Sequence, residues 1–170
     1  MLVIPNVLWA RGRQPAGYEH ISGNENRILL ALERAGEAAV SACLLLFRSM
    51  GPSVRLLPEG LFIDPRIILW IASFLLMILY ECWWIRYFRS ERTLEDFYSS
   101  FAGFPVAGAS LPVTATLILG IYSGNAVMIV SGLILGIGHI GIHLMHRKEV
   151  LQTPEEDSGL SAEAPNTDAV

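Results

Sequence analysis

The stretch that decides the fold spans residues 66–88 and reads RIILWIASFLLMILYECWWIRYF. Between Arg66 and Arg86 its only charged residue is Glu81. A bilayer core about 30 Å thick takes roughly 20 helical residues to cross. A helix suits this environment because it satisfies its own backbone hydrogen bonds. The stretch is therefore predicted to be a transmembrane helix.

The composition of the whole chain agrees with a membrane protein. Apolar residues make up 52% of the chain and charged residues only 16%, whereas about 25% are charged in ordinary soluble domains. The mean hydropathy is +0.45. The charged residues are clustered in short segments between long apolar stretches, which is typical of a polytopic membrane protein. We expect the lipid bilayer, and not nucleic acid, to be the surrounding partner.

Three further segments are long and apolar enough to be considered as spans, at about 27–47, 105–122 and 126–146. Only residues 123–125, with the sequence SGN, separate the last two, so these should form a tight antiparallel hairpin. The predicted fold class is an all-α integral membrane protein with four transmembrane helices in an antiparallel bundle.

The segment at 27–47 differs from the others because it contains Glu33, Arg34 and Glu37. Each charge at the centre of a membrane helix costs roughly 2.5–3.5 kcal/mol on insertion scales. Glu33 and Arg34 lie near one end, where long side chains reach the interface. We expect this segment to span the membrane; the alternative is an amphipathic helix that lies on the surface.

The basic residues predict the orientation of four spans. Eight lie on the side that holds the amino-terminal segment, the loop after residue 88 and the carboxyl-terminal tail; three lie on the other side. By the positive-inside rule, a multi-pass protein of the cell membrane would have both termini in the cytoplasm. The eight are Arg11, Arg13, Arg27, Arg86, Arg89, Arg92, Arg147 and Lys148; the three are Arg48, Arg55 and Arg66.

This orientation divides the chain into three regions. Residues 1–26 form a cytoplasmic amino-terminal segment, residues 27–148 the transmembrane domain, and residues 149–170 a cytoplasmic tail. The tail is acidic, rich in small residues and poor in large apolar ones, so it is predicted to be disordered. The pattern as a whole resembles that of short bacterial inner-membrane proteins, and no residue role follows from this resemblance.

The loop between the second and third spans predicts a short amphipathic helix in the cytoplasmic headgroup region. Its apolar residues recur at positions i, i+3, i+4 and i+7, with charges on the opposite side; they are Leu94, Phe97, Tyr98 and Phe101. Aromatic residues at the inner end of the second span fit a belt at the membrane interface; they are Trp83, Trp84 and Tyr87.

Ionisable residues from three predicted spans should lie at one depth. With a rise of about 1.5 Å per residue, Glu33, Glu81 and His139 each lie about 10 Å from the cytoplasmic end of their helices. His143 falls closer to the cytoplasm, and Glu37 lies deeper. A polar cluster near the cytoplasmic side of the bundle is therefore expected.

The fourth predicted span carries a packing face. Gly132, Gly136, His139, His143 and His146 follow one another at steps of four, three, four and three residues, as along the seam of a left-handed helix pair. Gly132 and Gly136 form a GxxxG motif, which lets another helix approach closely. The histidines continue this face and should point away from lipid.

Three interpretations of the polar residues stay open. In the first, His139 and His143 bind a divalent metal ion together with Glu81 or Glu33. In the second, the cluster handles protons or cations, or couples proton movement to that of a small solute or ion, because histidine titrates near neutral pH. In the third, Arg34 neutralises a glutamate within the bundle, and the histidines only support packing.

Motif comparison removes several activities. The spacing of His139, His143 and His146 resembles one histidine box of the membrane di-iron hydroxylases and desaturases, which need several boxes, whereas the chain has four histidines in all. Protease, Walker and dinucleotide motifs are absent. We expect a non-catalytic membrane component that forms a homo-oligomer or binds another membrane protein. Its polar cluster comprises Glu33, Arg34, Glu37, Glu81, His139 and His143.

Overall fold

The structure is a computed structural model that describes residues 3–23, 25–47, 50–57 and 60–152. It is mostly helical, and two short strands form a hairpin. The elements, in chain order, are α1 (Val3–Ala10), α2 (Tyr18–Ser22), α3 (Arg27–Leu46), β1 (Val54–Leu57), β2 (Gly60–Ile63), α4 (Ile67–Arg89), α5 (Leu94–Phe97), α6 (Ala107–Ser123) and α7 (Ala126–Gln152).

Two helices are long and apolar enough to cross a membrane. These are α4, with 23 residues, and α7, with 27 residues, which correspond to about 35 Å and 40 Å of helix. Among the described helices, only these two meet both the length and the composition criteria. The helix α6 is apolar but shorter, with 17 residues, and α3 has 20 residues and contains the three charges noted above.

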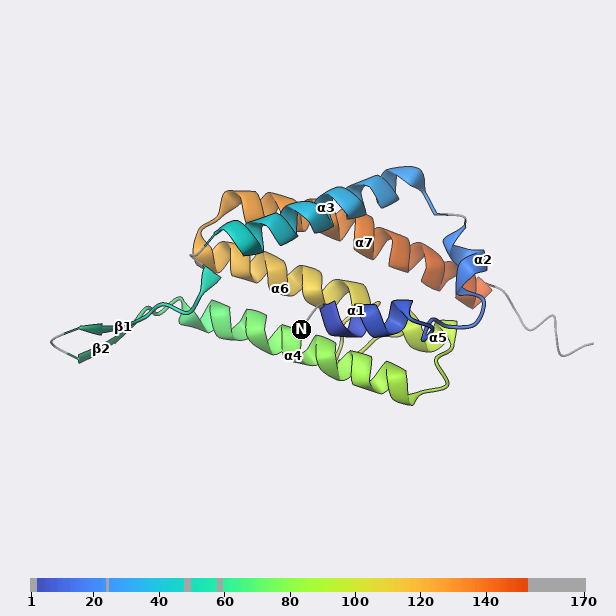
Figure 1. The fold of residues 1–170 in the computed structure, drawn as a ribbon, viewed down its shortest axis with the longest axis horizontal. Coiled ribbons are helices and arrows are strands. Elements are labelled where there is room, and N and C mark those ends of the chain that lie inside the picture. The colour runs from blue at the N-terminus through green and yellow to red at the C-terminus, as the bar shows by residue number, and fades with distance from the viewer. Residues whose placement is uncertain (1–2, 24, 48–49, 58–59, 153–170) are drawn as a thin grey trace, which may run out of the picture.

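The four long helices pack in the order α3–α7–α6–α4, and neighbours in this order run in opposite directions (Figure 1). The connection between α6 and α7 is tight because Gly124 adopts φ +63°, in the left-handed region. The Asn125 side chain then accepts a hydrogen bond from the backbone N–H of Met128, 3.1 Å away, and caps the start of α7.

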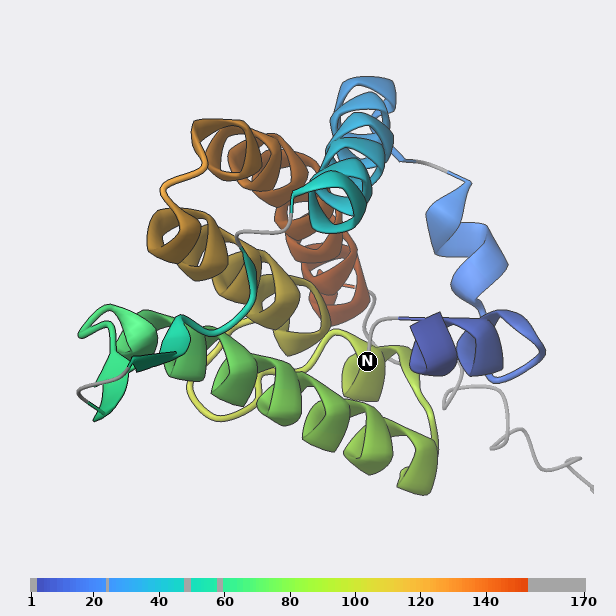
Figure 2. The same cartoon turned by 60° about the vertical axis from the view of Figure 1, so that its left-hand side comes forward.

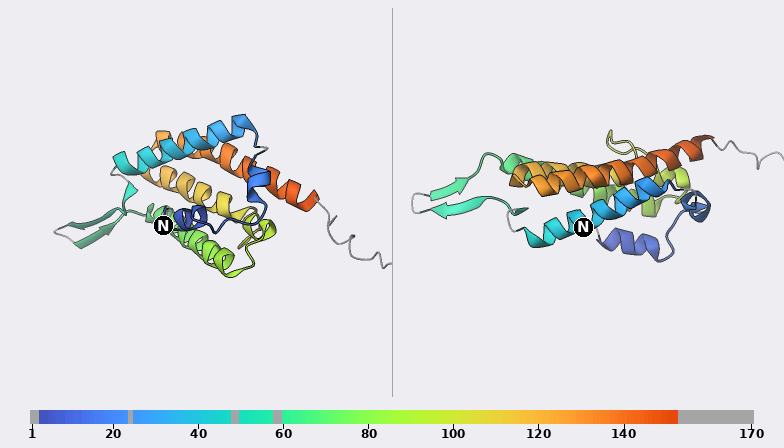
Figure 3. Two further views of the ribbon diagram at one scale, coloured as in Figure 1. Left: turned by 45° about the vertical axis from the view of Figure 1, so that its right-hand side comes forward. Right: turned by 90° about the horizontal axis from the view of Figure 1, so that it is seen from above.

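The packing of these helices does not close into a ring. Figure 2 shows α3 and α4 as the two outer helices, with α6 and α7 between them. Among the four long helices, extended packing joins α3 to α7, α7 to α6 and α6 to α4 only. The space between α3 and α4 is partly covered by α1, which lies across it near one end (Figure 3).

Glycines allow the closest helix contacts. A Cβ atom built at Gly36 of α3 would lie 2.5 Å from the Cα of Leu135 in α7, and one built at Gly138 of α7 would overlap the backbone nitrogen of Glu33 in α3. The glycines of the predicted GxxxG motif face α6 instead: Gly132 lies against Leu117, and Gly136 against Val113. The α3–α7 contact therefore depends on glycines outside that motif.

The aromatic residues at the end of α4 form a core inside the protein. Trp83, Trp84 and Tyr87 are 1%, 4% and 1% exposed, and they pack around Phe97 of α5. The predicted interfacial belt is therefore wrong for these three side chains. They are buried because residues 3–22 fold back over this end of the molecule, and Trp9 stacks on Phe97 with ring centroids 5.5 Å apart.

The predicted amphipathic helix is also shorter and differently placed. It comprises only Leu94–Phe97, and Thr93 and Asp96 form a capping box at its start. Phe97 and Tyr98 are 6% and 2% exposed. The expectation that they face lipid headgroups is wrong, because the apolar side of this segment packs against α4 and α7.

The opposite end of the molecule carries an antiparallel hairpin that the sequence analysis did not predict. In β1 and β2, Val54 pairs with Ile63, and the hairpin projects beyond the helices (Figure 1). Tyr122 anchors the segment before it: its hydroxyl accepts a hydrogen bond from the N–H of Ser53 at 2.7 Å and donates to the carbonyl of Gly51 at 3.0 Å.

The last helix extends further than the span predicted for it. It continues to Gln152 instead of ending near His146, so residues 149–152, predicted to belong to a disordered tail, are helical. The remainder of that predicted tail, residues 153–170, lies outside the described residues.

Candidate metal and ligand site

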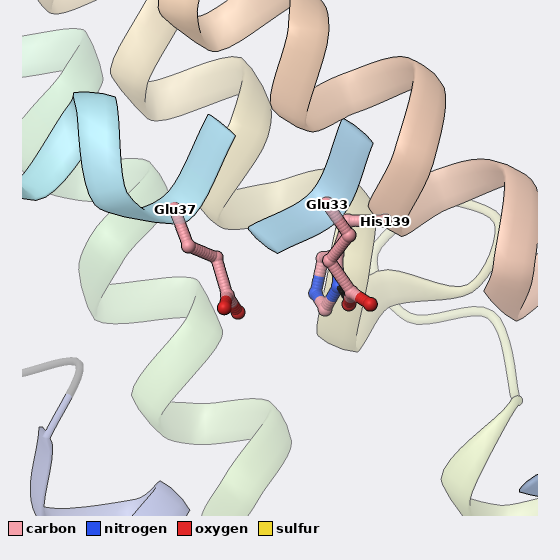
Figure 4. A group of neighbouring side chains, drawn as sticks. All are labelled: Glu33, Glu37 and His139. Atoms are coloured by element: carbon pink, nitrogen blue, oxygen red, sulfur yellow. Dashed lines mark hydrogen bonds and ion pairs between the residues drawn. The ribbon is translucent and has the colours of Figure 1, made fainter. Parts of the chain in front are cut away.

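Two glutamates of α3 point into the space beside α7. Asn26 caps α3 by accepting hydrogen bonds from the backbone N–H groups of Ile28, at 2.9 Å, and Leu29. Glu33 and Glu37 lie one turn apart on the helix that follows. Figure 4 shows both carboxylates extending from α3 in the same direction, with His139 beside Glu33.

The central contact joins α3 to α7. The Nδ1–H of His139 donates a hydrogen bond to Oε1 of Glu33 over 2.5 Å. Both side chains are mostly shielded, with 21% of His139 and 13% of Glu33 exposed. Gly138 makes this contact attainable, because α3 lies so close to it that a side chain at 138 would meet the α3 backbone.

Glu37 completes a group that could hold a metal ion. One ligand atom from each of Glu33, Glu37 and His139 lies within 4.8 Å of the other two; we call these residues the Glu–Glu–His group. Arg34 pairs with Glu37 at 3.3 Å, but these two side chains are 72% and 45% exposed, so solvent weakens this ion pair. Two carboxylates and one imidazole suit borderline cations such as Zn²⁺, Mn²⁺ and Fe²⁺.

A second histidine of α7 is buried without a hydrogen-bond partner. His143 lies next to His139, with ring centroids 4.7 Å apart. Its Nδ1 atom is buried and has no hydrogen-bond partner among the described residues. Because an unsatisfied buried polar atom is costly, a ligand that reaches this nitrogen would gain a hydrogen bond.

The third histidine connects the site to the amino-terminal segment. The Tyr98 hydroxyl lies 2.8 Å from Nδ1 of His146. Burial raises the pKa of Tyr98 far above its ordinary value, so this phenol stays protonated. Its O–H group donates a hydrogen bond to Nδ1 of the imidazole. The Nε2–H of His146 then faces Oε1 of Glu25, 3.8 Å away.

Glu25 is the carboxylate on the side of the site that faces the amino-terminal segment. Burial, and then the charge of Glu33, raise its pKa above the ordinary value. The same causes act on the neighbouring phenol, because burial, followed by the charges of Glu25 and Glu33, raises the pKa of Tyr18 to about 12. Glu25 is therefore a third, partly buried carboxylate on this side of the site, beside Glu33.

These residues line a cavity of about 490 Å³ between α3 and α4, which we call the inter-helix cavity. Its polar side is formed by α3 and α7 and includes the Glu–Glu–His group, His143 and His146. Its other side is aromatic and consists mainly of Tyr80, Trp83, Trp84 and Phe97, which we call the aromatic wall. Its volume is in the range of pockets for small organic ligands, roughly 300–1,000 Å³.

The structure brings together some of the sequence-predicted site residues and leaves one apart. Glu33, Arg34, Glu37, His139 and His143 all line the inter-helix cavity. Glu81 is not among the described residues that line it. One of its carboxylate oxygens is buried with no hydrogen-bond partner among the described residues. The predicted metal ligands His139 and His143 are adjacent. The metal-capable group in the structure contains His139 and Glu33, the predicted alternative to Glu81, and adds Glu37; it includes neither His143 nor Glu81.

Sequence reasoning missed Glu25, Trp9, Tyr98 and the aromatic wall as parts of the site. Trp9 and Glu25 belong to the segment before α3, and no periodicity in that segment indicates where it folds. Tyr98, Trp83 and Trp84 were predicted to lie at the membrane interface, and Tyr80 was not singled out. Their apolar pattern could have indicated a buried wall as well as a lipid-facing belt.

Comparisons with known proteins assign no family to this site. No family model matches the chain, no curated protein matches it, and no solved structure matches its fold.

Proposed function

We propose that the protein is a multi-pass membrane protein in which α3, α4, α6 and α7 all cross the bilayer, with both termini in the cytoplasm. At about 1.5 Å per residue, the 20 residues of α3 and 17 of α6 correspond to about 30 Å and 26 Å, close to the bilayer core. Exposed apolar side chains on the long helices support contact with lipid; they include Leu45, Ile68, Ile71, Leu75, Val130, Leu133 and Ile137.

The direction of the acidic groups supports the crossing of α3. Glu33 and Glu37 face the inter-helix cavity, and Glu33, with 13% of its side chain exposed, is shielded from lipid. Charged side chains inside a membrane are tolerated when they face the interior or a polar cavity. The predicted oligomer or membrane-protein partner stays a prediction.

Within this arrangement the protein functions as a divalent-cation-binding membrane component. The observation that carries this proposal is the Glu–Glu–His group, whose ligand atoms lie within 4.8 Å of one another. An ion between them would replace the hydrogen bond between His139 and Glu33 and release its proton. Three protein ligands would leave a coordination position open, as in zinc sites that bind an exogenous ligand.

Elemental analysis of detergent-purified protein, prepared without a polyhistidine tag or chelator, tests this function. We expect about one divalent metal ion per chain, and its loss in Glu33→Gln and His139→Ala. His20→Ala is the matched control, because this histidine is exposed and lies outside the cavity. Glu81→Gln separates the two ligand sets: retained metal supports the Glu–Glu–His group, and lost metal supports the set that includes Glu81. Absence of metal in the wild type refutes the proposal.

Proton handling is the second candidate function, and one contact series favours it. The hydrogen bond between Glu33 and His139, the adjacent His143 ring, and the Tyr98–His146 pair form a row of titratable groups. Histidines in such rows carry protons in transport proteins. Proton flux into liposomes along a pH gradient, present with the wild type and lost in Glu33→Gln, would support this function; equal flux with the wild type and in empty liposomes would exclude it.

A further inference from the structure

The inter-helix cavity lies between the two outer helices of the bundle. Because α3 and α4 share no extended packing among the described residues, the cavity is bounded on that side by the rims of these helices and by α1. On the α3 rim, Ser41 is exposed, and Glu37 is 45% exposed. In the proposed membrane arrangement, an opening between two outer helices faces the lipid, so its ligand can enter from the bilayer.

The two sides of the inter-helix cavity differ in chemistry. The aromatic wall offers ring faces and apolar edges, and Pro112 and Leu135 extend this apolar lining towards the middle of α6 and α7. The opposite side carries the Glu–Glu–His group and the unpartnered Nδ1 of His143. A ligand that matches both sides has one polar end and one apolar end.

The charge of the polar end follows from the groups around the proposed ion. A divalent cation would balance the carboxylates of Glu33 and Glu37, and the Arg34 guanidinium lies 3.3 Å from Glu37, whereas Glu25 adds a third carboxylate to the cavity lining. The ion and Arg34 therefore present positive charge to a head group. His143 can donate a hydrogen bond from Nδ1 to an oxygen that reaches it. An anionic oxygen head group complements both features, and it can occupy the open coordination position of the metal.

We infer that the inter-helix cavity binds a membrane-dissolved single-chain amphiphile with a carboxylate head group. The head lies at the metal ion, Arg34 and His143, and the chain lies along the aromatic wall. This inference rests on the proposed metal-binding function, because without the ion the polar side carries the two carboxylates of Glu33 and Glu37 and would repel an anion.

The tryptophans of the cavity provide the measurement. Trp9, Trp83 and Trp84 line it, whereas Trp70 lies at the opposite end of α4. In a Trp70→Phe background, quenching of fluorescence by a bromine-labelled fatty acid therefore reports occupancy. The full-length protein in nanodiscs is titrated with three probes of equal chain length, which carry a carboxylate, an amine or an alcohol. Each titration is made with Zn²⁺-loaded and with metal-depleted protein, and the metal content of each sample is measured.

We expect the carboxylate probe to bind at least about tenfold more tightly to the metal-loaded protein, which is the effect of one partly screened charge pair. Stronger quenching by the amine probe, in either metal state, would overturn the inference in favour of a cationic ligand. Equal quenching by all three probes would indicate partitioning into lipid and would also overturn it. If the protein binds metal but shows no preference for the carboxylate probe, the inference about the amphiphile is refuted and the proposed metal-binding function stands. If it binds no metal, both are refuted.

A pair of variants on α3 tests the route into the cavity. Ser41→Phe adds a ring at the exposed rim, and Ala38→Phe adds the same ring at an exposed position that does not line the cavity. We expect Ser41→Phe to reduce quenching by the carboxylate probe without loss of metal, and Ala38→Phe to leave both unchanged. Equal quenching in the two variants would contradict entry between α3 and α4.

Discussion

A methyl group at Gly138 should separate α3 from α7 and disturb the proposed metal site. The Cβ atom of Gly138→Ala would overlap the backbone nitrogen of Glu33 and lie 2.7 Å from the carbonyl oxygen of Leu29. Both atoms belong to the α3 backbone, so a side-chain rotation cannot relieve the overlap. The helix itself must move, and it carries Glu33 away from His139.

The magnitude follows from two opposing effects. Overpacking of a tight contact costs about 1–3 kcal/mol, and replacing glycine by alanine within a helix returns about 1 kcal/mol. Gly141→Ala is the matched control on the same helix, because its Cβ would meet only the flexible end of the Leu29 side chain, at 3.3 Å. The control should gain up to about 1 kcal/mol, so the two variants should differ by about 2 kcal/mol.

Unfolding by SDS titration in detergent micelles, followed by circular dichroism, measures this difference. Zinc titration of the folded variants measures the effect on the site. We expect Gly138→Ala to be the less stable variant and to bind Zn²⁺ at least about tenfold more weakly than Gly141→Ala, as a loss of about 1.4 kcal/mol implies. Equal stability and equal zinc affinity in the two variants would refute the assignment of the closest α3–α7 contact to Gly138.

Three further predictions concern other contacts of the site and the helices. Tyr98→Phe should lower the free energy of unfolding by about 1–3 kcal/mol, because it leaves Nδ1 of the buried His146 without its 2.8 Å hydrogen-bond partner. SDS titration measures this loss, and an unchanged unfolding midpoint would contradict the contact. Ser73→Ala removes a buried hydrogen bond of 2.8 Å to the carbonyl of Ala115 and should cost about 0.6 kcal/mol in the same assay. Zinc affinity should fall as the pH is lowered from about 7.5 to 5, because a metal binds deprotonated carboxylates and neutral imidazole, whose ordinary pKa is about 6.5; a constant affinity over this range would contradict imidazole coordination.

The helix lengths could be predicted because they follow from local sequence. Apolar runs and the charges between them define where a helix can begin and end, and the bounds of α3, α4 and α6 lie within two residues of the predicted spans. The short connection after residue 122 also required α6 and α7 to be neighbours. The hairpin β1–β2 has only four residues in each strand, too few for a clear alternating pattern.

The partner of each helix face could not be predicted in the same way. Four glycines of α7 lie on two of its sides: Gly132 and Gly136 face α6, whereas Gly138 and Gly141 face α3. Sequence spacing indicated the GxxxG pair, which lies against α6, whereas Gly138 makes the close contact with α3. Which helix packs on which face of α7 depends on how the complete surfaces of two helices fit together. A motif on one helix does not determine this.

The depth calculation explains why only part of the polar cluster was anticipated. It placed Glu33, Glu81 and His139 at one level, and Glu33 and His139 are in contact. Height along a helix does not determine direction around its axis, since each residue turns by about 100°. In α4 the neighbouring Tyr80 and Trp83 line the inter-helix cavity, whereas Glu81 does not belong to that lining.

The packing order α3–α7–α6–α4 has a consequence for biosynthesis. The first long helix to leave the ribosome packs mainly on the last one. In the proposed membrane arrangement, α3 therefore has to remain in the membrane while α4 and α6 are made. During that interval Glu33 lacks His139, and α3 has to limit its own charge. The Arg34–Glu37 pair, formed within one turn of the helix, serves this purpose before α7 arrives. The ion pair would then assist the membrane insertion of α3 more than it stabilises the folded protein. Arg34→Ala should therefore reduce the yield of inserted protein more than the stability of the finished fold.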